Sequence, residues 1–306
     1  MPEQNSIQYI VHKDIDLAKW DACISQSSNG LVYACSYYLE TMATNWDALI
    51  LNDYEAVMPL TWNKKFGVYY LYQPFITAQL GLFGNNINAE LLDAFLKAIP
   101  GKFRYWDIYL NHDNIFESSE FSLYLRSNYI LNLNRPYKEI CQGYRENIRR
   151  NIKKAENTGC KVIKAFNVEQ VIELAVMQMR EYDKKSIDNT ERFRKLYSIL
   201  SSKNMATTYG ISLNNQLLAS SVFFFSHNRA YYILVGNHPN GKTLGASHAL
   251  IDAFIKDNAG QDMLLDFEGS DIRNLAFFYE SFGAVKEKFT GIKNNKLPFY
   301  LKWLKQ

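Results

Sequence analysis

The segment with the clearest chemical potential is residues 236–243, GNHPNGKT, which satisfies the phosphate-loop pattern G-x-x-x-x-G-K-[ST]. In that pattern backbone N–H groups cradle phosphates and the lysine reaches the terminal ones. The segment lies between a predicted strand and a predicted helix, and residues 264–266, LLD, resemble the Walker B strand, whose aspartate helps to hold Mg²⁺ in such sites. Taken alone, the pattern predicts a nucleotide-binding loop.

Three features of the sequence argue against that interpretation. The strands before Gly236 are joined by tight turns, which only antiparallel neighbours allow, whereas a phosphate loop follows a strand of a parallel sheet. About 70 residues follow it, too few for the remaining strands and helices. The corresponding loop of the first half, residues 73–84, contains no lysine. Phosphate cradling here would be a later addition or a coincidence.

A stripe of basic residues lies on a helix predicted over residues 144–158. Its members fall at i, i+4, i+5, i+8 and i+9, along one side of the helix. They are Arg145, Arg149, Arg150, Lys153 and Lys154. Glu146 is the acidic residue that interrupts them, and Gly159 fits the position after the helix end. The stripe is either a solvated face or a phosphate-binding surface.

Two carboxylates form a further candidate. Asp266 and Glu268 project to one face of a predicted strand, near the carboxyl end where open α/β sheets bind ligands. Asp266 has a counterpart in Asp107, and recurrence in both halves favours a structural role. Glu268 aligns with Tyr109 instead and is the candidate base or amine-orienting residue; a hydrogen-bonded structural carboxylate is the alternative.

The chain repeats one pattern in its two halves. Tyr-Tyr pairs begin at residues 69 and 231, which are 162 positions apart, and each is followed by a loop, an Asp-Ala-Phe helix and a strand with aspartate. The helix aspartates and the strand aspartates are each 159 positions apart, so the loop is expected to change length. Duplication of one α/β unit is the simplest explanation.

Each half is therefore predicted to hold an antiparallel meander followed by one β-loop-α-β crossover, which makes a mixed sheet with one parallel pair. The expected strands are 49–52, 56–60, 66–72 and 106–110 in the first half and 208–213, 217–225, 231–235 and 263–267 in the second. The crossover helices are expected at 89–99 and 245–255. The fold class is α+β (mixed α/β).

Composition sets the broad class. The 306 residues, 47% hydrophobic, suffice for two domains, and the net charge of +3 provides no overall field for nucleic acid or an anionic membrane. Four widely spaced cysteines and the absence of a leader-like start indicate a reduced, cytoplasmic protein. No run of apolar residues is long enough for a membrane span, and no spacing of His, Cys and carboxylates suggests a metal.

Several segments together resemble the Fem family, whose members are tandem GNAT-fold proteins. They are residues 145–159, 239–246 and 265–270. Residues 242–247, KTLGAS, resemble a degenerate GNAT signature at a helix start, and residues 278–284, FYESFGA, resemble the later tyrosine-containing helix end. The likeness is clearest over residues 129–284, and the internal repeat extends it to the first half. The best-known members add amino acids to peptidoglycan bridges from aminoacyl-tRNA.

The resemblance implies a bacterial acyltransferase with two tandem GNAT-like (acyl-CoA N-acyltransferase) domains, residues 1–122 and 123–306. The implied donor is an acyl-CoA or an aminoacyl-tRNA acting as co-substrate, with no tightly bound cofactor. The implied acceptor is a small-molecule or peptide amine, with a cell-wall precursor among the candidates and tRNA as a candidate partner. The first half would shape an interdomain acceptor cleft.

The resemblance also implies roles for individual residues. Donor pyrophosphate would meet backbone N–H groups at the helix start, with the donor bound by Val235, Lys242, Thr243, Leu244, Gly245, Ala246 and Ser247. Independently of the resemblance, the basic stripe makes Arg145, Arg149 and Lys153 the expected substrate-binding residues, together with His238, which could titrate near neutrality or contact the donor. Tyr279 would protonate a departing thiolate. The alternatives are that Tyr279 belongs to the core and that His238 is a solvent-exposed loop residue.

Two other functional classes stay open at this point. One is a noncatalytic binding module that retained the fold, because a fold alone does not secure an activity. The other is a nucleotide-binding protein that uses residues 236–243 as a phosphate loop.

Overall fold

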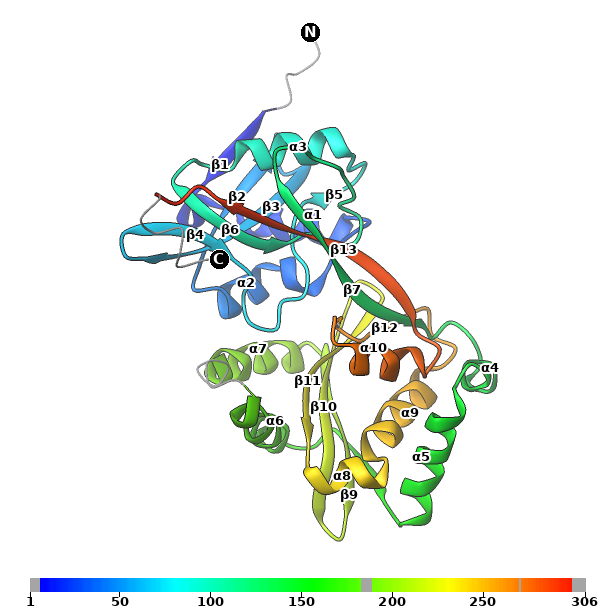
Figure 1. Ribbon diagram of the computed structural model, residues 1–306. Helices are drawn as coiled ribbons and strands as arrows, with labels where there is room; N and C mark the ends of the chain where they lie inside the picture. Colours follow the sequence, from blue (N-terminus) through cyan, green and yellow to red (C-terminus); the bar gives the residue numbers. More distant parts are fainter. Residues whose placement is uncertain (1–5, 183–188, 270, 299–306) are drawn as a thin grey trace. The chain divides into compact units, whose positions relative to one another are not determined.

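The computed structural model describes residues 6–182, 189–269 and 271–298. The chain divides into two compact units (Figure 1): the first reaches Arg126 and includes the segment that begins at Lys288, and the second comprises residues 127–287. The sequence led us to expect a boundary at residue 122 and the whole C-terminal segment in the second domain. Ser270, the last residue of one Fem-like segment, lies outside the described residues.

The first unit contains one mixed sheet. Its elements are β1 (Ile7–Ile10), η1 (His12–Asp14), α1 (Leu17–Gln26), η2 (Val32–Ala34), α2 (Ser36–Met42), β2 (Asn45–Leu51), β3 (Ala56–Lys65), β4 (Val68–Tyr72), β5 (Phe83–Gly84), α3 (Ala89–Ala98) and β6 (Phe103–Tyr109). The strand order is β1-β2-β3-β4-β6. Its pairs are antiparallel except for β4 and β6, which are parallel.

The second unit repeats this arrangement. Its elements are α4 (Tyr137–Gln142), α5 (Glu146–Asn157), β8 (Lys161–Lys164), α6 (Val168–Tyr182), α7 (Thr190–Ser202), β9 (Ala206–Leu213), β10 (Gln216–Ser226), β11 (Arg229–Asn237), α8 (Pro239–Leu244), α9 (Ala246–Asn258), β12 (Leu264–Asp266) and α10 (Arg273–Glu280). The order is β8-β9-β10-β11-β12, with β11 and β12 parallel. Strands β7 (Ser122–Asn132) and β13 (Val285–Asn295) each begin in one unit and end in the other.

The internal duplication is confirmed. Each unit runs strand, two helices, three antiparallel strands, crossover helix and parallel strand. One detail of the predicted alignment was wrong. Tyr72 lies opposite Asp107 and Tyr231 lies opposite Asp266, so the residues of both parallel pairs are 159 positions apart. The two Tyr-Tyr pairs, which are 162 positions apart, therefore do not occupy equivalent positions in the two sheets but differ by three residues. Equivalent positions are set by the hydrogen bonds between strands, not by matching residue types.

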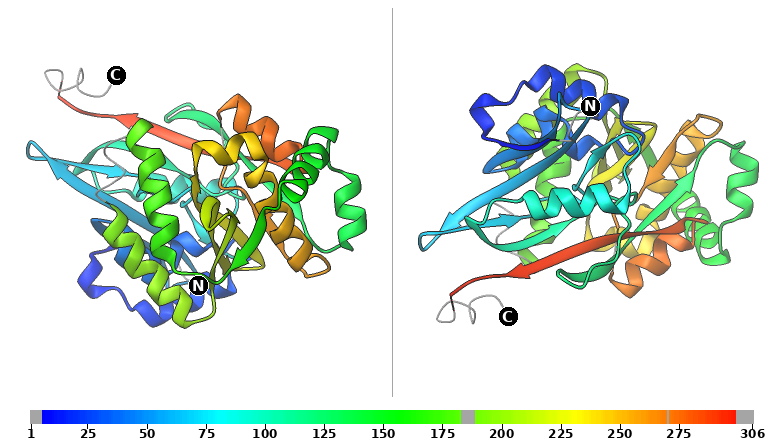
Figure 2. Two further views of the ribbon diagram at one scale, coloured as in Figure 1. Left: turned by 90° about the horizontal axis from the view of Figure 1, so that it is seen from below. Right: turned by 90° about the horizontal axis from the view of Figure 1, so that it is seen from above.

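Both faces of the second sheet are covered by helices. Phe223 of β10 stacks on Phe254 of α9 with ring centroids 3.7 Å apart, and the next residue, Phe224, stacks on Phe193 of α7 at 5.8 Å. Successive strand residues point to opposite faces. The helices α6 and α7 therefore cover one face, and α9 with α5 covers the other (Figures 1 and 2).

The first sheet is covered in the same way. Trp46 of β2 packs on Trp20 of α1 with ring centroids 5.0 Å apart, whereas Leu49 belongs to the core that contains Leu92 and Phe95 of α3. Because residues 46 and 49 point to opposite faces of β2, α1 and α3 lie on opposite sides of this sheet. Helix α3 begins at the predicted residue, Ala89, and ends at Ala98, one residue before the predicted end.

Gly236 supports a stability prediction. A Cβ at this position would lie 2.7 Å from the backbone nitrogen of Ala175, so Gly236→Ala must displace α6 from β11. We expect a loss of about 1–3 kcal/mol in unfolding free energy. Gly101→Ala, whose Cβ would meet nothing within 4 Å, is the control and should change stability by less than about 0.5 kcal/mol. Equal urea midpoints for the two variants would contradict the assigned packing.

Candidate functional site

The two parallel strands of the second unit separate soon after they pair. Strands β11 and β12 are in register from Arg229 opposite Leu264 to Tyr231 opposite Asp266. Beyond that point β11 continues along β10 to Asn237. The chain leaving β12 turns to β7, where the Phe267 N–H donates to the Tyr129 carbonyl at 2.9 Å. Residues 232–237 of β11 thus extend past β12. The Asn237 N–H donates to Gln178 Oε1 at 2.8 Å, and the strand edge before it is a place where a ligand can pair.

A bulge lies within this stretch. Val222 is opposite Leu234, but Phe223 is opposite Tyr232, which leaves Ile233 as the extra residue of β11. A bulge bends its strand and increases local twist. It contributes to the separation of β11 from β12.

The end of β11 is tied to the start of α9. His238 begins α8, and its Nδ1 accepts the Asn240 N–H at 3.2 Å. Gly245, with φ of +75°, separates α8 from α9. The Ser247 hydroxyl then donates to Asn237 Oδ1 at 2.6 Å. The expected donor residues from 242 to 247 are therefore held beside the end of the extended strand.

The start of α9 lacks a side-chain cap. Its N-cap is Gly245, which has no side chain to accept first-turn N–H groups, whereas Asn88 at the start of α3 accepts the Leu91 N–H at 2.8 Å. The first-turn amides of Ala246 and Ser247 have no partner within their own helix and lie at its positive end. Such amides bind phosphate. The crossover helices of the two units therefore differ in how their first-turn amides are capped.

Gly245 also serves packing. A Cβ there would lie 2.4 Å from the carbonyl oxygen of Asn151 on α5, so α5 rests against the junction of α8 and α9. Ala246 is fully buried, and Val235 and Leu244 pack against the core of the unit. A small residue at 245 is thus required by chain packing and by the left-handed conformation, whether or not a ligand is bound.

The phosphate-loop pattern has a different structural basis. Gly236 belongs to β11, and Gly241 lies inside α8 within van der Waals contact of β10, because a Cβ there would meet the Leu218 carbonyl oxygen. Lys242 is exposed on α8, and the Thr243 hydroxyl donates to the Asn240 carbonyl at 2.9 Å. A helical turn therefore occupies the place where a phosphate-cradling loop would have to be.

Two residues of the basic stripe, Arg145 and Arg149, make contacts within the protein. Arg145 precedes α5 as its N-cap and interacts with α10, 3.6 Å from Glu280 and 4.7 Å from the Phe277 ring centroid. Arg149 donates to the carbonyls of Cys141 and Gln142 at 3.1 and 2.9 Å and so stabilises the end of α4. Both guanidinium groups thus have protein partners.

The remaining stripe residues, Lys153, Arg150 and Lys154, are exposed. His238, the fourth expected substrate-binding residue, lies 3.1 Å from the Gln216 amide nitrogen through Nε2. Helix α5 therefore presents four exposed cations, and Arg149 and Lys153 are the two that were expected to contact substrate.

The two expected catalytic residues both adjoin Phe267, which precedes Glu268 in the chain and stacks on Tyr279. Glu268 has φ of +65°, and its N–H donates to Asp266 Oδ1 at 2.9 Å, which holds the turn after β12. The Tyr279 ring stacks on Phe267 at 4.6 Å. Burial, and then the charge of Glu268, raise the pKa of Tyr279 above its ordinary value. Tyr279 is therefore a protonated phenol at neutral pH.

Tyr232 is a third member that sequence reasoning missed. It is buried, and its pKa is raised by burial and then by the nearby Tyr279. It is also the first residue of β11 beyond the paired segment. We call Tyr232, Glu268 and Tyr279 the Tyr-Glu cluster. In the sequence, the Tyr-Tyr pair serves only to define the repeat. Its position on the predicted strand that pairs in parallel is the signal by which Tyr232 could have been found.

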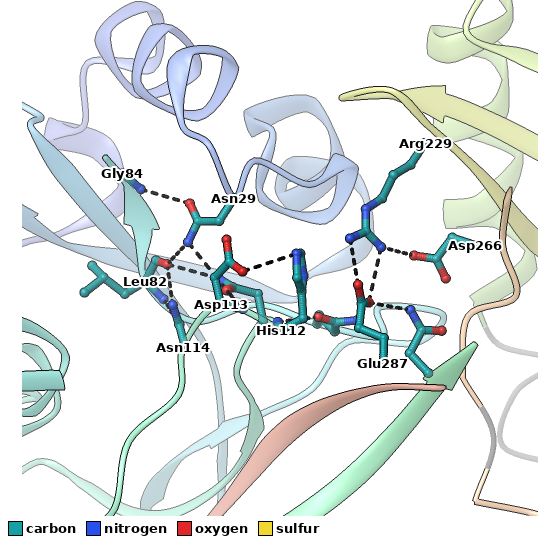
Figure 3. Close-up of polar contacts among 12 residues, drawn as sticks. Asn29, Leu82, Gly84, His112, Asp113, Asn114, Arg229, Asp266 and Glu287 are labelled. Atoms are coloured by element: carbon teal, nitrogen blue, oxygen red, sulfur yellow. Dashed lines mark hydrogen bonds and ion pairs between the residues drawn. The ribbon is translucent and has the colours of Figure 1, made fainter. Parts of the chain in front are cut away.

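Asp266 has the contacts of a structural residue (Figure 3). The Arg229 guanidinium donates to Asp266 at 2.9 Å and to Glu287 at 3.0 Å, and the Asn128 amide donates to Glu287 at 3.0 Å. Asp266 is 1% exposed. Its counterpart Asp107 instead accepts the Tyr124 hydroxyl at 2.8 Å. The two aspartates share a strand position but not their partners.

The first unit fills its corresponding loop with its own side chains. The backbone carbonyl of Leu82 accepts hydrogen bonds from the side-chain amides of Asn29, Asn111 and Asn114 at 2.9, 3.0 and 3.0 Å (Figure 3). The side-chain Oδ1 of Asn114 in turn accepts the Leu82 N–H at 2.7 Å. With α3 capped by Asn88, the features of the α9 start are replaced here by internal hydrogen bonds.

Comparison with known proteins identifies the type of domain and the fold. Residues 142–271 match the model of the acetyltransferase (GNAT) domain. FemX is similar along 92% of this chain and 96% of its own, with a TM-score of 0.63 and 14% identity. No curated protein sequence gives a significant match.

Two further solved structures are similar over nearly the whole chain. L-PGS from Bacillus licheniformis is 12% identical, with coverage of 93% of this chain and 92% of its own and a TM-score of 0.53. A tandem GNAT protein from the clavulanic acid biosynthesis pathway is 9% identical, with coverage of 96% and 99% and a TM-score of 0.54. The chain therefore has a Fem-like tandem GNAT fold, as the sequence predicted, and acyl transfer is the general chemistry that the matched domain supports.

The part of the chain that the structure describes contains neither a cluster of metal-binding side chains nor a membrane-spanning helix. Across residues 6–182, 189–269 and 271–298, no three His, Cys, Asp or Glu side chains are grouped as a metal would need. No helix in the same ranges combines the length and apolarity of a membrane span.

His248 generates a pH prediction. It lies on α9 against Phe278 with ring centroids 5.0 Å apart, and burial lowers its pKa from 6.5 to about 4. Between these values the unfolded chain binds a proton that the folded chain does not, so stability falls as pH falls through this window. We expect His248→Phe to remove about 2–3 kcal/mol of that loss. Urea unfolding at pH 7, 5.5 and 4 measures it, and parallel curves for both proteins would contradict it.

The Arg229 network generates a second prediction. Arg229→Met leaves the buried carboxylates of Asp266 and Glu287 without their cation, which costs about 3–5 kcal/mol. Lys19→Met, which breaks an exposed pair with Asp53, is the control and should cost less than about 1 kcal/mol. Protonation of a carboxylate relieves the repulsion, so the deficit of Arg229→Met should shrink as pH falls. Similar denaturation midpoints for the two variants at pH 7 would refute the argument.

Proposed function

We propose that the protein is an N-acyltransferase that moves an acyl or aminoacyl group from an acyl-CoA or aminoacyl-tRNA to an amine acceptor. One observation carries the proposal: the extended edge of β11, residues 232–237, has Tyr232 of the Tyr-Glu cluster at one end and the start of α9 at the other. An extended donor arm can lie along this edge, with its phosphate at α9 and its reactive carbonyl at the cluster.

The residues of the cluster suit the two proton transfers of this reaction. A neutral amine attacks the donor carbonyl carbon, and Glu268 accepts the proton that the nitrogen loses. The bond from that carbon to the leaving sulfur or oxygen then breaks, and Tyr279 gives its proton to the leaving atom. A tyrosine whose pKa is raised stays protonated until that step. Positioning of donor and acceptor supplies much of the remaining rate enhancement.

The donor site combines backbone and side-chain contacts. The amide of half-buried Ser247 is the expected phosphate contact at the start of α9, because Ala246 before it is fully buried; Lys242 adds charge from the solvent side. The acceptor is an amine on a small molecule or peptide, with a cell-wall precursor as the finer hypothesis. A noncatalytic module is the competing hypothesis; the placement of Glu268 directly after Phe267, on which the Tyr279 ring stacks, favours the enzyme.

Donor binding tests the α9 start. A ligand that binds only the folded protein raises its melting temperature. We expect such a shift with acetyl-CoA or aminoacyl-tRNA. Ser247→Asp should abolish the shift because it places a carboxylate beside the donor phosphate, although an acid in a first turn is otherwise favourable to the helix. Ser247→Ala, which removes the bond to Asn237 without adding charge, is the matched control and should keep most of the shift.

An ATP-induced shift that requires magnesium, with no response to any acyl donor, would overturn the donor assignment. Silence toward every donor would favour the noncatalytic module.

Catalysis tests the Tyr-Glu cluster. Tyr279→Phe and Glu268→Gln should each lower kcat by about 10²–10⁴ while donor binding is retained, because each removes one proton-transfer group. Tyr209→Phe is the control: its hydroxyl bonds Asp257 at 2.6 Å and has no role in the proposed step. Release of free thiol from acyl-CoA in the presence of an amine measures the rate. Wild-type kcat in both cluster variants would show that positioning alone accounts for the activity.

A further inference from the structure

The first unit contains a pocket lined by cations at the amino ends of its parallel strands, opposite the carboxyl ends where such sheets bind ligands. The pocket has a volume of about 450 Å³ and lies where β4 and β6 begin. Its charged lining residues are Lys102, Arg104 and Lys296, and none of the described residues that line it is acidic. Ligands of open α/β sheets bind at the carboxyl ends of parallel strands, so this cationic pocket is distinct from the first unit's counterpart of the donor site.

The strongest evidence is a pair of like charges on neighbouring strands. Tyr105 of β6 lies opposite Asn295 of β13, and the next residues are joined by a hydrogen bond from the Lys296 N–H to the Arg104 carbonyl at 2.8 Å. Arg104 and Lys296 are both exposed, and no carboxylate of the described residues forms an ion pair with either. Like charges placed opposite each other destabilise a sheet. An anionic ligand would relieve that repulsion.

The third cation is held in place. Lys102 Nζ lies 2.7 Å from the Tyr9 hydroxyl and 3.8 Å from Asp47, which offsets part of its charge. It also lies 4.9 Å from the Phe103 ring centroid. A positioned ammonium beside two uncompensated cations leaves the pocket with a net positive charge.

The fold itself does not require these cations. Counted back along the chain from the segments that share a register, Lys102 and Arg104 correspond to Gln261 and Met263, each 159 positions later; Arg104 is the extra residue of β6 at a register shift. At these two positions the second unit has neutral residues, with Asp262 between them. The described part of the first unit, moreover, carries more acidic than basic residues, so the cations do not follow from its overall composition.

Further cations adjoin the pocket on the β3–β4 hairpin. Lys64 lies opposite Tyr69 and Lys65 lies opposite Val68, and both of these β4 residues line the pocket. Lys64 Nζ is 4.7 Å from the Tyr69 ring centroid. Phe66, at the tip of the hairpin, is 74% exposed.

We propose that the cationic pocket binds a phosphate group, with Arg104 and Lys296 as its direct contacts. Arginine and lysine together match the charge and the several acceptor oxygens of phosphate. The volume fits a small phosphate ester, and the neighbouring lysines with exposed Phe66 also fit the phosphate of an anionic lipid headgroup. The experiment separates these two sources.

Binding is measured with sodium pyrophosphate by calorimetry and with phosphatidylglycerol vesicles by sedimentation, with phosphatidylcholine vesicles as the neutral control. The Ser247→Asp background suppresses phosphate binding at α9, so the outcome does not depend on the proposed function. In that background Arg104→Gln with Lys296→Gln should weaken binding at least tenfold. The melting temperature of the unliganded double variant should stay level or rise, because the like-charge repulsion is gone.

Lys13→Gln with Lys97→Gln removes the same charge elsewhere in the first unit and should leave binding unchanged. If the pocket variant loses pyrophosphate binding but keeps vesicle binding, the ligand is a soluble phosphate ester. If it loses vesicle binding but keeps pyrophosphate binding, the ligand is a lipid headgroup. Binding of neither probe by the Ser247→Asp protein, or equal effects of the two double variants, would overturn the proposal.

Discussion

The candidate site depends on how briefly β11 and β12 are paired. The two strands share the register from Arg229 to Tyr231 and then diverge, and the paired segment is anchored by the buried bonds of Arg229 to Asp266 and Glu287. A buried arginine with two carboxylates holds its position firmly because leaving any one of the charges unpaired is costly. This network fixes where the strands stop pairing, and thereby where a strand edge becomes available.

The same network also orients the residue proposed as the base. Asp266 uses one carboxylate oxygen for Arg229 and the other for the Glu268 N–H, which supports a left-handed conformation at Glu268. That conformation is uncommon for a residue with a side chain and persists only where its surroundings impose it. A structural aspartate and its neighbouring glutamate, two residues apart, therefore have separate roles set by their different burial.

The duplication shows how one fold can hold different sites. Both units have a crossover helix after a strand that pairs in parallel, but Asn88 caps α3 whereas Gly245 leaves the start of α9 uncapped. Buried asparagines saturate the Leu82 carbonyl in the first unit. Conversely, Lys102 and Arg104 line the strand starts of the first unit at two positions where the second has neutral residues. Divergence has thus acted on strand ends and loops, while strands and helices stayed equivalent.

The sequence by itself determined the duplicated order of elements and the resemblance to Fem proteins, because hydrophobic periodicity, turn residues and spacing act locally and survive in both halves. Tertiary structure decided the register of the repeat and the packing reasons for Gly236 and Gly245, which face backbone of distant helices. It also decided that Arg149 caps α4 and that Tyr232 joins Tyr279. These are contacts between residues far apart in the chain, and no local pattern encodes which distant atoms will meet.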